Sequence, residues 1–463
     1  MPRRSVIGFF VCFFGLLASG HLGSSDAGGQ LRAATLLVQT GSLSAAAAPA
    51  AGWLPSPGGR FYEVHDIGAI VLMLPAGIVA ARAQAIPAST PDWQVPRLGA
   101  AVASLSYALL AALACWWTCR ALAEWYPPRR AFALALALPF TTILTAYGRT
   151  AWDVLGCAAF VAAAMAGAAC ALTRGGRRQI WMTAALLGVA CSFRFSFAPF
   201  AALTFALLFA RGTQPRDRWG AAAILLLVLA PSFAYNLVRT GAFWRPPTAL
   251  PAYLAANNAI QGDIAAGLFG ALLSPNRGLF VFCPVLLLAF GLPAVWTRIT
   301  AGERRLIAPF GAGALLYVVM IASLRNWGAF GWGPRYLVPI LPIAYVAAAI
   351  VFLRLWHGRA IVLTLLLACS AAVTLPSMLV NWPAVVASTP GAADQFAPAP
   401  VQIRAGWRAL RSPDPFVVPD VWVAHLSRQS PAGRAAAVAA SIVLVAGALI
   451  SLRRILQATA APG

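Results

Sequence analysis

Residues 24–29, SSDAGG, and residues 61–68, FYEVHDIG, open and close a stretch that directly follows the first apolar segment of the chain. The chain has 463 residues, of which 60% are hydrophobic and only 10% are charged. Acids are therefore scarce, yet Asp26, Glu63 and Asp66 all lie in this stretch, together with His65. We expect the rest of the chain to be a membrane scaffold that holds a site at one water–lipid boundary.

The composition indicates an all-α polytopic membrane protein. The mean hydropathy is +0.77, and apolar runs of about twenty residues, enough for a helix to cross a bilayer core of about 30 Å, recur along the chain. The net charge is +22, and every basic residue is an arginine. The arginines stand in short clusters between apolar runs, as topology signals do, which argues against a nucleic-acid-binding face. The lack of lysine excludes Schiff-base chemistry and a Walker A loop.

The arginine clusters determine the predicted topology. The apolar run Ile67–Ala81 reaches only about fifteen residues before Arg82, which is short for a crossing. If this run lies in the outer interface, the later clusters all fall on the cytoplasmic side with Arg3 and Arg4, as the positive-inside rule requires. The clusters are Arg120/Arg129/Arg130, Arg174/Arg177/Arg178, Arg211/Arg216/Arg218, Arg298/Arg304/Arg305, Arg354/Arg359 and Arg453/Arg454. Both termini are then cytoplasmic.

This topology predicts about twelve transmembrane helices and a long first outer loop, from about residue 23 to about residue 97, that contains interfacial helices and Asp92. We interpret residues 1–378 as one transmembrane module and residues 379–433 as an outer loop or small cap. Residues 434–463 form the last transmembrane helix and a short tail. The predicted spans are 6–22, 98–119, 131–148, 154–172, 180–193, 197–210, 219–237, 279–297, 306–323, 337–353, 360–378 and 434–452.

Asp26 is the first candidate for a catalytic carboxylate, because it follows the first span directly. The alternative is that Ser25 or Asp26 caps the helix that the next residues predict. A second polar group in the same loop, Glu63, His65 and Asp66, favours a functional carboxylate. This group could bind an acceptor hydroxyl or a divalent cation, or could simply keep the start of the next helix in water.

Further candidates combine arginine, acid and aromatic side chains at the predicted outer boundary. Asp153 lies close to Arg149 in a very short outer hairpin. Three other outer segments combine arginine with aromatic residues, namely residues 274–280, SPNRGLF, residues 325–336, RNWGAFGWGPRY, and Arg194 with its neighbouring phenylalanines. Arginine forks suit phosphate, and aromatic faces stack on sugar rings or isoprenoid. An aromatic belt with snorkelling arginines is the alternative. The candidates are Arg149, Arg277 and Arg335 for phosphate, Asp153 for the acceptor or a metal, and Tyr62, Trp327, Trp332 and Tyr336 for stacking.

Over roughly residues 6–353, these motifs resemble the C-type (GT-C) membrane glycosyltransferases, which use polyprenyl-phosphate sugars. This family includes the protein mannosyltransferases and the lipid A aminoarabinose transferase. The resemblance rests on the acid after the first span, the Phe61-Tyr62-Glu63 block, the Arg149–Asp153 hairpin and the two segments at 274–280 and 325–336. It implies a GT-C-like bundle in which Asp26 is the catalytic base.

The resemblance also implies a function and a location. The chain would move a hexosyl or pentosyl group, with inversion, from a polyprenyl-phosphate donor to a hydroxyl of a glycolipid, polysaccharide or protein of the cell envelope. It would lie in the bacterial inner membrane with a periplasmic active site, with no certain cofactor and a possible divalent cation. A carrier or flippase for a polyprenyl-linked glycan and an inactive assembly scaffold are the alternatives. The lack of an acid in the middle of any predicted span favours chemistry over ion-coupled transport.

Overall fold

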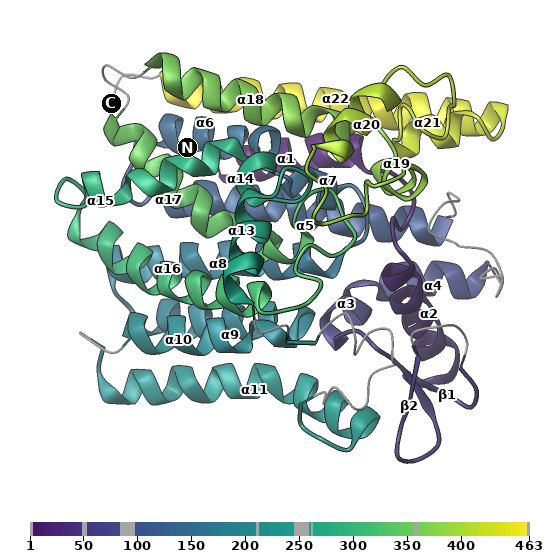
Figure 1. The fold of residues 1–463 in the computed structure, drawn as a ribbon, viewed down its shortest axis with the longest axis horizontal. Helices are drawn as coiled ribbons and strands as arrows, with labels where there is room; N and C mark the ends of the chain where they lie inside the picture. Colours follow the sequence, from purple (N-terminus) through teal and green to yellow (C-terminus); the bar gives the residue numbers. More distant parts are fainter. Residues whose placement is uncertain are drawn as a thin grey trace.

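The computed structural model describes residues 3–48, 53–83, 98–209, 213–244, 259–260, 263–355 and 360–460. Their helices form a bundle whose connecting segments gather at its two ends (Figure 1). The predictions that concern Asp92, Arg97, Arg211 and Arg359 lie outside the described residues.

Among the residues that the structure describes, seven helical segments are long and apolar enough to cross a membrane, so the predicted multi-pass helical class is confirmed. Each of them falls on a predicted span, because a long apolar run is the strongest helix signal that a sequence carries. They are α5 (Leu98–Leu122), α8 (Asp153–Arg174), α11 (Pro215–Thr240), α16 (Ala301–Ala322), the pair η4 (Arg335–Ile340) and α17 (Leu341–Leu355), α18 (Ala360–Leu379) and α22 (Pro431–Ala460).

The remaining predicted spans are also helical, but they are shorter or broken. Proline, which cannot donate a backbone hydrogen bond, stands at Pro284 and Pro293, where the predicted span 279–297 divides into short pieces. The number of about twelve crossings therefore stays a prediction. The shorter elements in these spans are α1 (Arg3–Leu17), α6 (Pro128–Thr141), α7 (Leu144–Gly148), α9 (Arg177–Phe193), η1 (Phe195–Phe197), α10 (Ala198–Phe209), α14 (Leu279–Phe282), η3 (Pro284–Gly291) and α15 (Leu292–Val295). Helix α13 (Ile264–Leu273) lies between two predicted spans.

The first loop contains a helix, a small sheet and two short helices. Helix α2 (Ser25–Thr40) precedes three strands, β1 (Ser44–Ala45), β2 (Trp53–Pro55) and β3 (Phe61–Glu63). The strands pair antiparallel in the order β1-β3-β2, with Tyr62 opposite both Ser44 and Leu54. The sequence analysis had not predicted this sheet, because strands of two or three residues show no periodicity.

Helices α3 (Ile67–Leu72) and α4 (Leu74–Arg82) occupy the predicted interfacial segment. They have six and nine residues and are separated at Met73. At about 1.5 Å per residue, neither approaches the roughly 30 Å of a bilayer core. Helix α4 packs on α2, where a side chain at Gly77 would meet the backbone of Ala34 at 2.8 Å. The segment therefore folds back onto the first loop.

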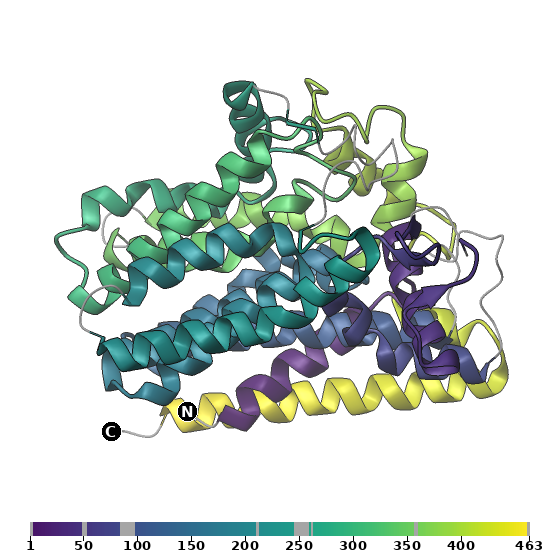
Figure 2. The same cartoon turned by 90° about the horizontal axis from the view of Figure 1, so that it is seen from below.

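Helices α1 and α22 run antiparallel and in close contact. Gly8 faces Ser451 and Gly15 faces Leu444, and Cys12 lies against Gly447. Glycine permits such a close approach of two helices in a membrane. The N and C termini consequently lie at one end of the bundle and the first loop lies at the other (Figure 2). We call these the terminal end and the first-loop end.

The described arginine clusters gather at the terminal end. Arg3, Arg120 and Arg174 line one cavity there, and Arg177 and Arg305 line another. Arg174 pairs with Glu124 at 2.9 Å, and Arg354 pairs with Glu303 at 3.4 Å. The clusters thus share one end of the bundle with both termini, as the arginine pattern predicts.

Residues 379–433 are ordered at the first-loop end. They contain α19 (Trp382–Ser388), α20 (Val401–Ala409) and α21 (Trp422–Ser427). The backbone N–H of Trp422 donates to the carbonyl of Ala18 at 2.8 Å, and buried Asp420 lies 3.0 Å from the ring of His21. This segment is therefore joined to the beginning of the first loop.

The short helices α3 and α4 lead to a test of the topology. In a cysteine-free background, Ala83→Cys, on the exposed residue after α4, should react with a membrane-impermeant thiol reagent from the outside of intact cells. Ala123→Cys, exposed near the terminal end, should react only after permeabilisation. Labelling of position 83 only after permeabilisation would exclude the predicted arrangement.

Candidate active site

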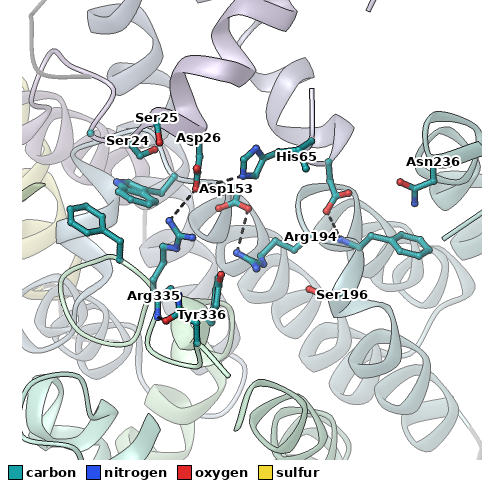
Figure 3. Close-up of a pocket in the computed structure, with 18 of the residues that line it drawn as sticks. Ser24, Ser25, Asp26, His65, Asp153, Arg194, Ser196, Asn236, Arg335 and Tyr336 are labelled. Carbon is teal, nitrogen blue, oxygen red and sulfur yellow. Dashed lines mark hydrogen bonds and ion pairs between the residues drawn. The ribbon is translucent and has the colours of Figure 1, made fainter. Parts of the chain in front are cut away.

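A cavity of about 570 Å³ opens at the first-loop end (Figure 3). Its walls come from the ends of helices that are far apart in sequence, including α2, α8, α9, α11 and η4. Of the residues predicted from the sequence, those that line it are Asp26, His65, Asp66, Asp153, Arg335 and Tyr336.

Asp26 lies in the first turn of α2 and faces two cations. Its Oδ2 atom is 3.2 Å from Nη1 of Arg335 and 3.5 Å from Nε2 of His65. Burial by itself would raise the pKa of Asp26, but the charges and hydrogen bonds of His65 and Arg335 outweigh it and hold the pKa well below its ordinary value. Asp26 is therefore ionised, and its carboxylate lies in one wall of the cavity.

The cap of α2 is neither of the two predicted residues. Ser24 occupies the N-cap position, and its side chain accepts a hydrogen bond from the backbone N–H of Ala27 at 3.1 Å. Ser25 and Asp26 lie inside the helix, so the capping alternative for Asp26 is wrong. The Asp26 carboxylate therefore does not cap the helix, and it points at the cavity (Figure 3).

His65 is held by Glu63, the buried residue at the end of β3. Oε1 of Glu63 is 2.6 Å from Nδ1 of His65, and Oε2 accepts from the backbone N–H of His65 at 2.5 Å. Burial would lower the pKa of His65, but the neighbouring charges of Glu63 and Asp26 raise it well above its ordinary value. At neutral pH the imidazole is thus a cation whose Nε2 faces Asp26.

Arg239 fixes the backbone behind His65. It is fully buried near the end of α11 and donates to the carbonyls of Glu63, Val64 and His65 at 3.2, 2.8 and 2.7 Å. Its second terminal nitrogen contacts Asp66 at 3.1 Å, and Asp66 also accepts the backbone N–H of Phe195 at 2.8 Å. Asp66 is therefore a structural partner at the rim of the cavity.

The opposite wall carries two arginines against aromatic rings. Arg194, at the end of α9, lies 3.4 Å from Asp153 and 4.6 Å from the ring centre of Tyr336. Arg335 lies 4.7 Å from the ring centre of Trp152. The rings hold the guanidinium planes through cation–π contact, which leaves their edges directed into the cavity.

Two of the predicted phosphate ligands lie elsewhere. Arg149 is fully buried and donates to the carbonyls of Leu17, Ser377, Val380 and Asp420 and to the Asp420 carboxylate. Its donors are thus directed at the chain itself.

Arg277 is likewise buried and donates to the carbonyl of Ala393 at 3.0 Å and to that of Ala329. Burial lowers its pKa to about 10. Neither Arg149 nor Arg277 lines the cavity, so the structure gives both arginines a structural place in the loops.

The predicted stacking residues divide in the same way. Tyr336 lines the cavity, whereas Trp327 and Trp332 are fully buried outside it, and Tyr62 packs on Tyr235 with ring centres 6.1 Å apart. Lining residues to which the sequence analysis assigned no role include Arg194, Trp152, Asn236, Asn326 and Phe330. Arg194 had a usable signal, since an arginine that interrupts an apolar run requires a partner.

The charges of the cavity fit an anion better than a metal ion. Asp26, Asp66 and Asp153 are each paired with an arginine. Among the residues that the structure describes, no three His, Cys, Asp or Glu side chains come together as metal ligands. The acids therefore already have cationic partners, and a divalent cation would have to displace them.

The sequence matches no family model and no curated protein. The fold is similar to that of ArnT from Cupriavidus metallidurans bound to undecaprenyl phosphate, with a TM-score of 0.52 and 15% identity over 96% of this chain and 74% of that chain. The Archaeoglobus fulgidus oligosaccharyltransferase in the apo form gives a TM-score of 0.44 and 11% identity, over 94% of this chain and 59% of that chain. The likeness to ArnT shows that the two proteins share a fold, as expected from the resemblance of the sequence motifs to the family that includes the lipid A aminoarabinose transferase.

The burial of Arg277 leads to a prediction about the stability of the protein. Arg277→Lys keeps the charge but loses the planar fork that reaches several carbonyls, so the free energy of unfolding should fall by about 2–3 kcal/mol. Thermal unfolding in detergent measures this, and Arg408→Lys, on the exposed face of α20, is the control. An unchanged melting temperature, combined with weaker donor binding, would return Arg277 to the role of phosphate ligand.

Proposed function

We propose that this chain is an inverting membrane glycosyltransferase. It moves a hexosyl or pentosyl group from a polyprenyl phosphate to a hydroxyl of a glycolipid, polysaccharide or protein. The observation that carries the proposal is the position of Asp26, an ionised carboxylate set beside Arg335 and His65 in the cavity of a GT-C fold. A carboxylate base next to cations is what transfer from a phosphate-linked sugar requires.

The donor's phosphate would bind the cationic side of the cavity. Arg335 and Arg194 present guanidinium edges there, and His65 adds a third positive charge. The N-termini of α2 and α8 also open on the cavity, and helix N-termini favour anions. That the similar ArnT structure contains undecaprenyl phosphate supports a polyprenyl phosphate as the carrier.

The reaction follows from these positions. Asp26 takes the proton of the acceptor hydroxyl while the acceptor oxygen forms a bond to the anomeric carbon. The bond between that carbon and the phosphate oxygen breaks, and its electron pair leaves with the polyprenyl phosphate. The cations stabilise the negative charge of the departing phosphate, so no step requires a general acid or a divalent cation. Attack on the face opposite the phosphate inverts the anomeric carbon.

The aromatic side chains around the charged groups would hold the sugar and the beginning of the lipid. Trp152, Phe330 and Tyr336 line the cavity beside Arg335, and Trp152 and Phe330 stack with ring centres 6.4 Å apart. Ring faces of this kind bind the apolar face of a pyranose or an isoprene unit. A carrier or scaffold would need the same rings but not an acid, and Asp26 favours the enzyme.

The proposal includes the location. The arginine clusters at the terminal end support a cytoplasmic side there, with about twelve crossings. The active site then faces the periplasm of the inner membrane. Residues 1–378 form the GT-C-like catalytic module, residues 379–433 a cap, and residues 434–463 the last crossing and the tail.

The assignment of Asp26 is tested by Asp26→Asn. The substitution keeps the shape and removes the proton acceptor, so turnover should fall by at least about 10²-fold, or about 2.7 kcal/mol of activation free energy. Transfer in reconstituted vesicles, with polyprenyl-phosphate sugars extracted from a deletion strain as donors, measures the loss. Because Ser24 caps α2, the amount of folded protein should stay normal. Near-normal transfer by this variant would contradict the assignment of Asp26 as the base and make Asp153 the next candidate.

The role of Arg335 is tested by Arg335→Lys. Lysine retains the charge but loses the fork and the stacking on Trp152, so the KM for the donor should rise about tenfold, or about 1.4 kcal/mol. Arg325→Lys, an exposed arginine in the same outer segment, should leave the KM unchanged. Equal kinetics in the two lysine variants would place Arg335 among the arginines that only stabilise the fold.

A further inference from the structure

The two cations beside Asp26 are also the groups that a phosphate would be expected to bind. A single carboxylate oxygen, Oδ2 of Asp26, lies 3.2 Å from Arg335 and 3.5 Å from His65. Phosphate oxygens and carboxylate oxygens form the same charge-assisted contacts with such cations. In Figure 3 the three side chains converge on one point of the cavity.

We propose that Asp26 occupies the place of the donor's phosphate in the donor-free protein, and that the arriving phosphate takes over Arg335 and His65 and so releases Asp26 to act as the base. This inference rests on the proposed function and adds a form of regulation to the same site. The proton affinity of Asp26 is then high only when a donor is bound.

The physical reason is the effect of charge on basicity. A carboxylate that two cations stabilise holds its negative charge tightly, so it accepts a proton poorly. A phosphate that binds the same cations neutralises them, and its own negative charge close by favours the protonated form of Asp26. Both effects raise the proton affinity of Asp26 when the acceptor hydroxyl must be deprotonated.

The cations are fixed more firmly than the carboxylate. The ring of His65 is held by Glu63 at 2.6 Å, and its carbonyl by Arg239 at 2.7 Å. Arg335 lies between Trp152 and Tyr336, at 4.7 and 5.2 Å from the ring centres. An entering phosphate would thus meet two cations that keep their positions.

The Asp26 side chain is suited to move aside. It is 32% exposed and lies in the first turn of α2, and its contacts described above are to the side chains of Arg335 and His65. The other two acids of the cavity are also bonded to backbone, because Asp66 accepts from the N–H of Phe195 and Asp153 from that of Val154. A change of rotamer is therefore enough to release Asp26.

A competitor in the free protein weakens binding of the ligand that it imitates. Asp26→Asn removes this competitor, so the base-deficient variant should bind polyprenyl phosphate more tightly than the wild type. Partly exposed ion pairs are weak, so the gain should be about three- to tenfold in Kd. A site in which Asp26 and the phosphate occupy separate places would show no such gain.

The experiment measures the Kd of undecaprenyl phosphate, and of the uncharged polyprenol as a probe of lipid binding alone, for the purified full-length protein in nanodiscs. Asp26→Asn should bind the phosphate about three- to tenfold more tightly and the polyprenol unchanged. Asp66→Asn is the matched control, because it removes the same charge from the same cavity but frees Arg239, whose other donors are bound to the carbonyls of Val64 and His65. Its gain should be less than about twofold.

Further variants make the result decisive. In an Arg335→Gln background, Asp26→Asn should lose most of its gain, because the cation for which the two anions compete is gone. Asp26→Ser repeats the measurement if the asparagine variant is poorly produced. An unchanged or weaker affinity in the Asp26 variants, an equal gain in Asp66→Asn, or a gain that persists in the Arg335→Gln background would each overturn the proposal.

The outcomes separate this inference from the proposed function. Lost transfer without a gain in affinity leaves Asp26 as the base and overturns the exchange with phosphate. A gain in affinity with normal transfer shows a phosphate site and overturns the release of the base. Lost transfer together with a selective gain supports both.

Discussion

Arginine side chains buried among carbonyl oxygens are the constraint on which the first-loop end of this protein depends. Arg149, Arg239 and Arg277 are fully buried, and an isolated buried charge would cost several kcal/mol. Each of them instead donates to carbonyls of loops that are distant in the sequence. These hydrogen bonds fix the loops, because a loop that moved away would leave a buried guanidinium without hydrogen-bond partners. The walls of the cavity are thereby held in place in a chain that has little other polar structure.

A second set of arginines has the opposite arrangement. Arg194 and Arg335 lie against aromatic rings, and their ionic partners, Asp153 and Asp26, are part of the cavity wall. Such pairs are exchangeable, because a phosphate offers the same contacts as a carboxylate. The same residue type therefore stabilises the fold in one place and is proposed to bind the donor in another. The difference is whether its partners are backbone carbonyls or side chains at the cavity.

The position of the cavity suits a substrate that is part lipid and part water-soluble. It lies where the apolar helices end and the first loop begins, so charged groups and aromatic rings meet there. In the proposed reaction, the donor's phosphate would reach Arg335 at this level while its isoprenoid chain stays among the helices. The described arginine clusters lie at the opposite end with both termini. The charge at the cavity therefore comes from the few charged residues that line it.

The sequence offered Asp26, His65, Asp153 and Arg335 as separate candidates, and by itself it determined the membrane class, the location of the apolar helices and the shared end of the two termini. These follow from local composition, since apolar length and the sign of flanking charge act without regard to the rest of the fold. Only the tertiary structure decided which arginines face inward and which face the cavity, and only it showed the small sheet of the first loop. Arg149 meets Asp420 across 271 positions, and Arg335 meets Asp26 across 309. Partners so distant leave no periodic or local signal, because burial of a guanidinium depends on which carbonyls the packed helices bring to it.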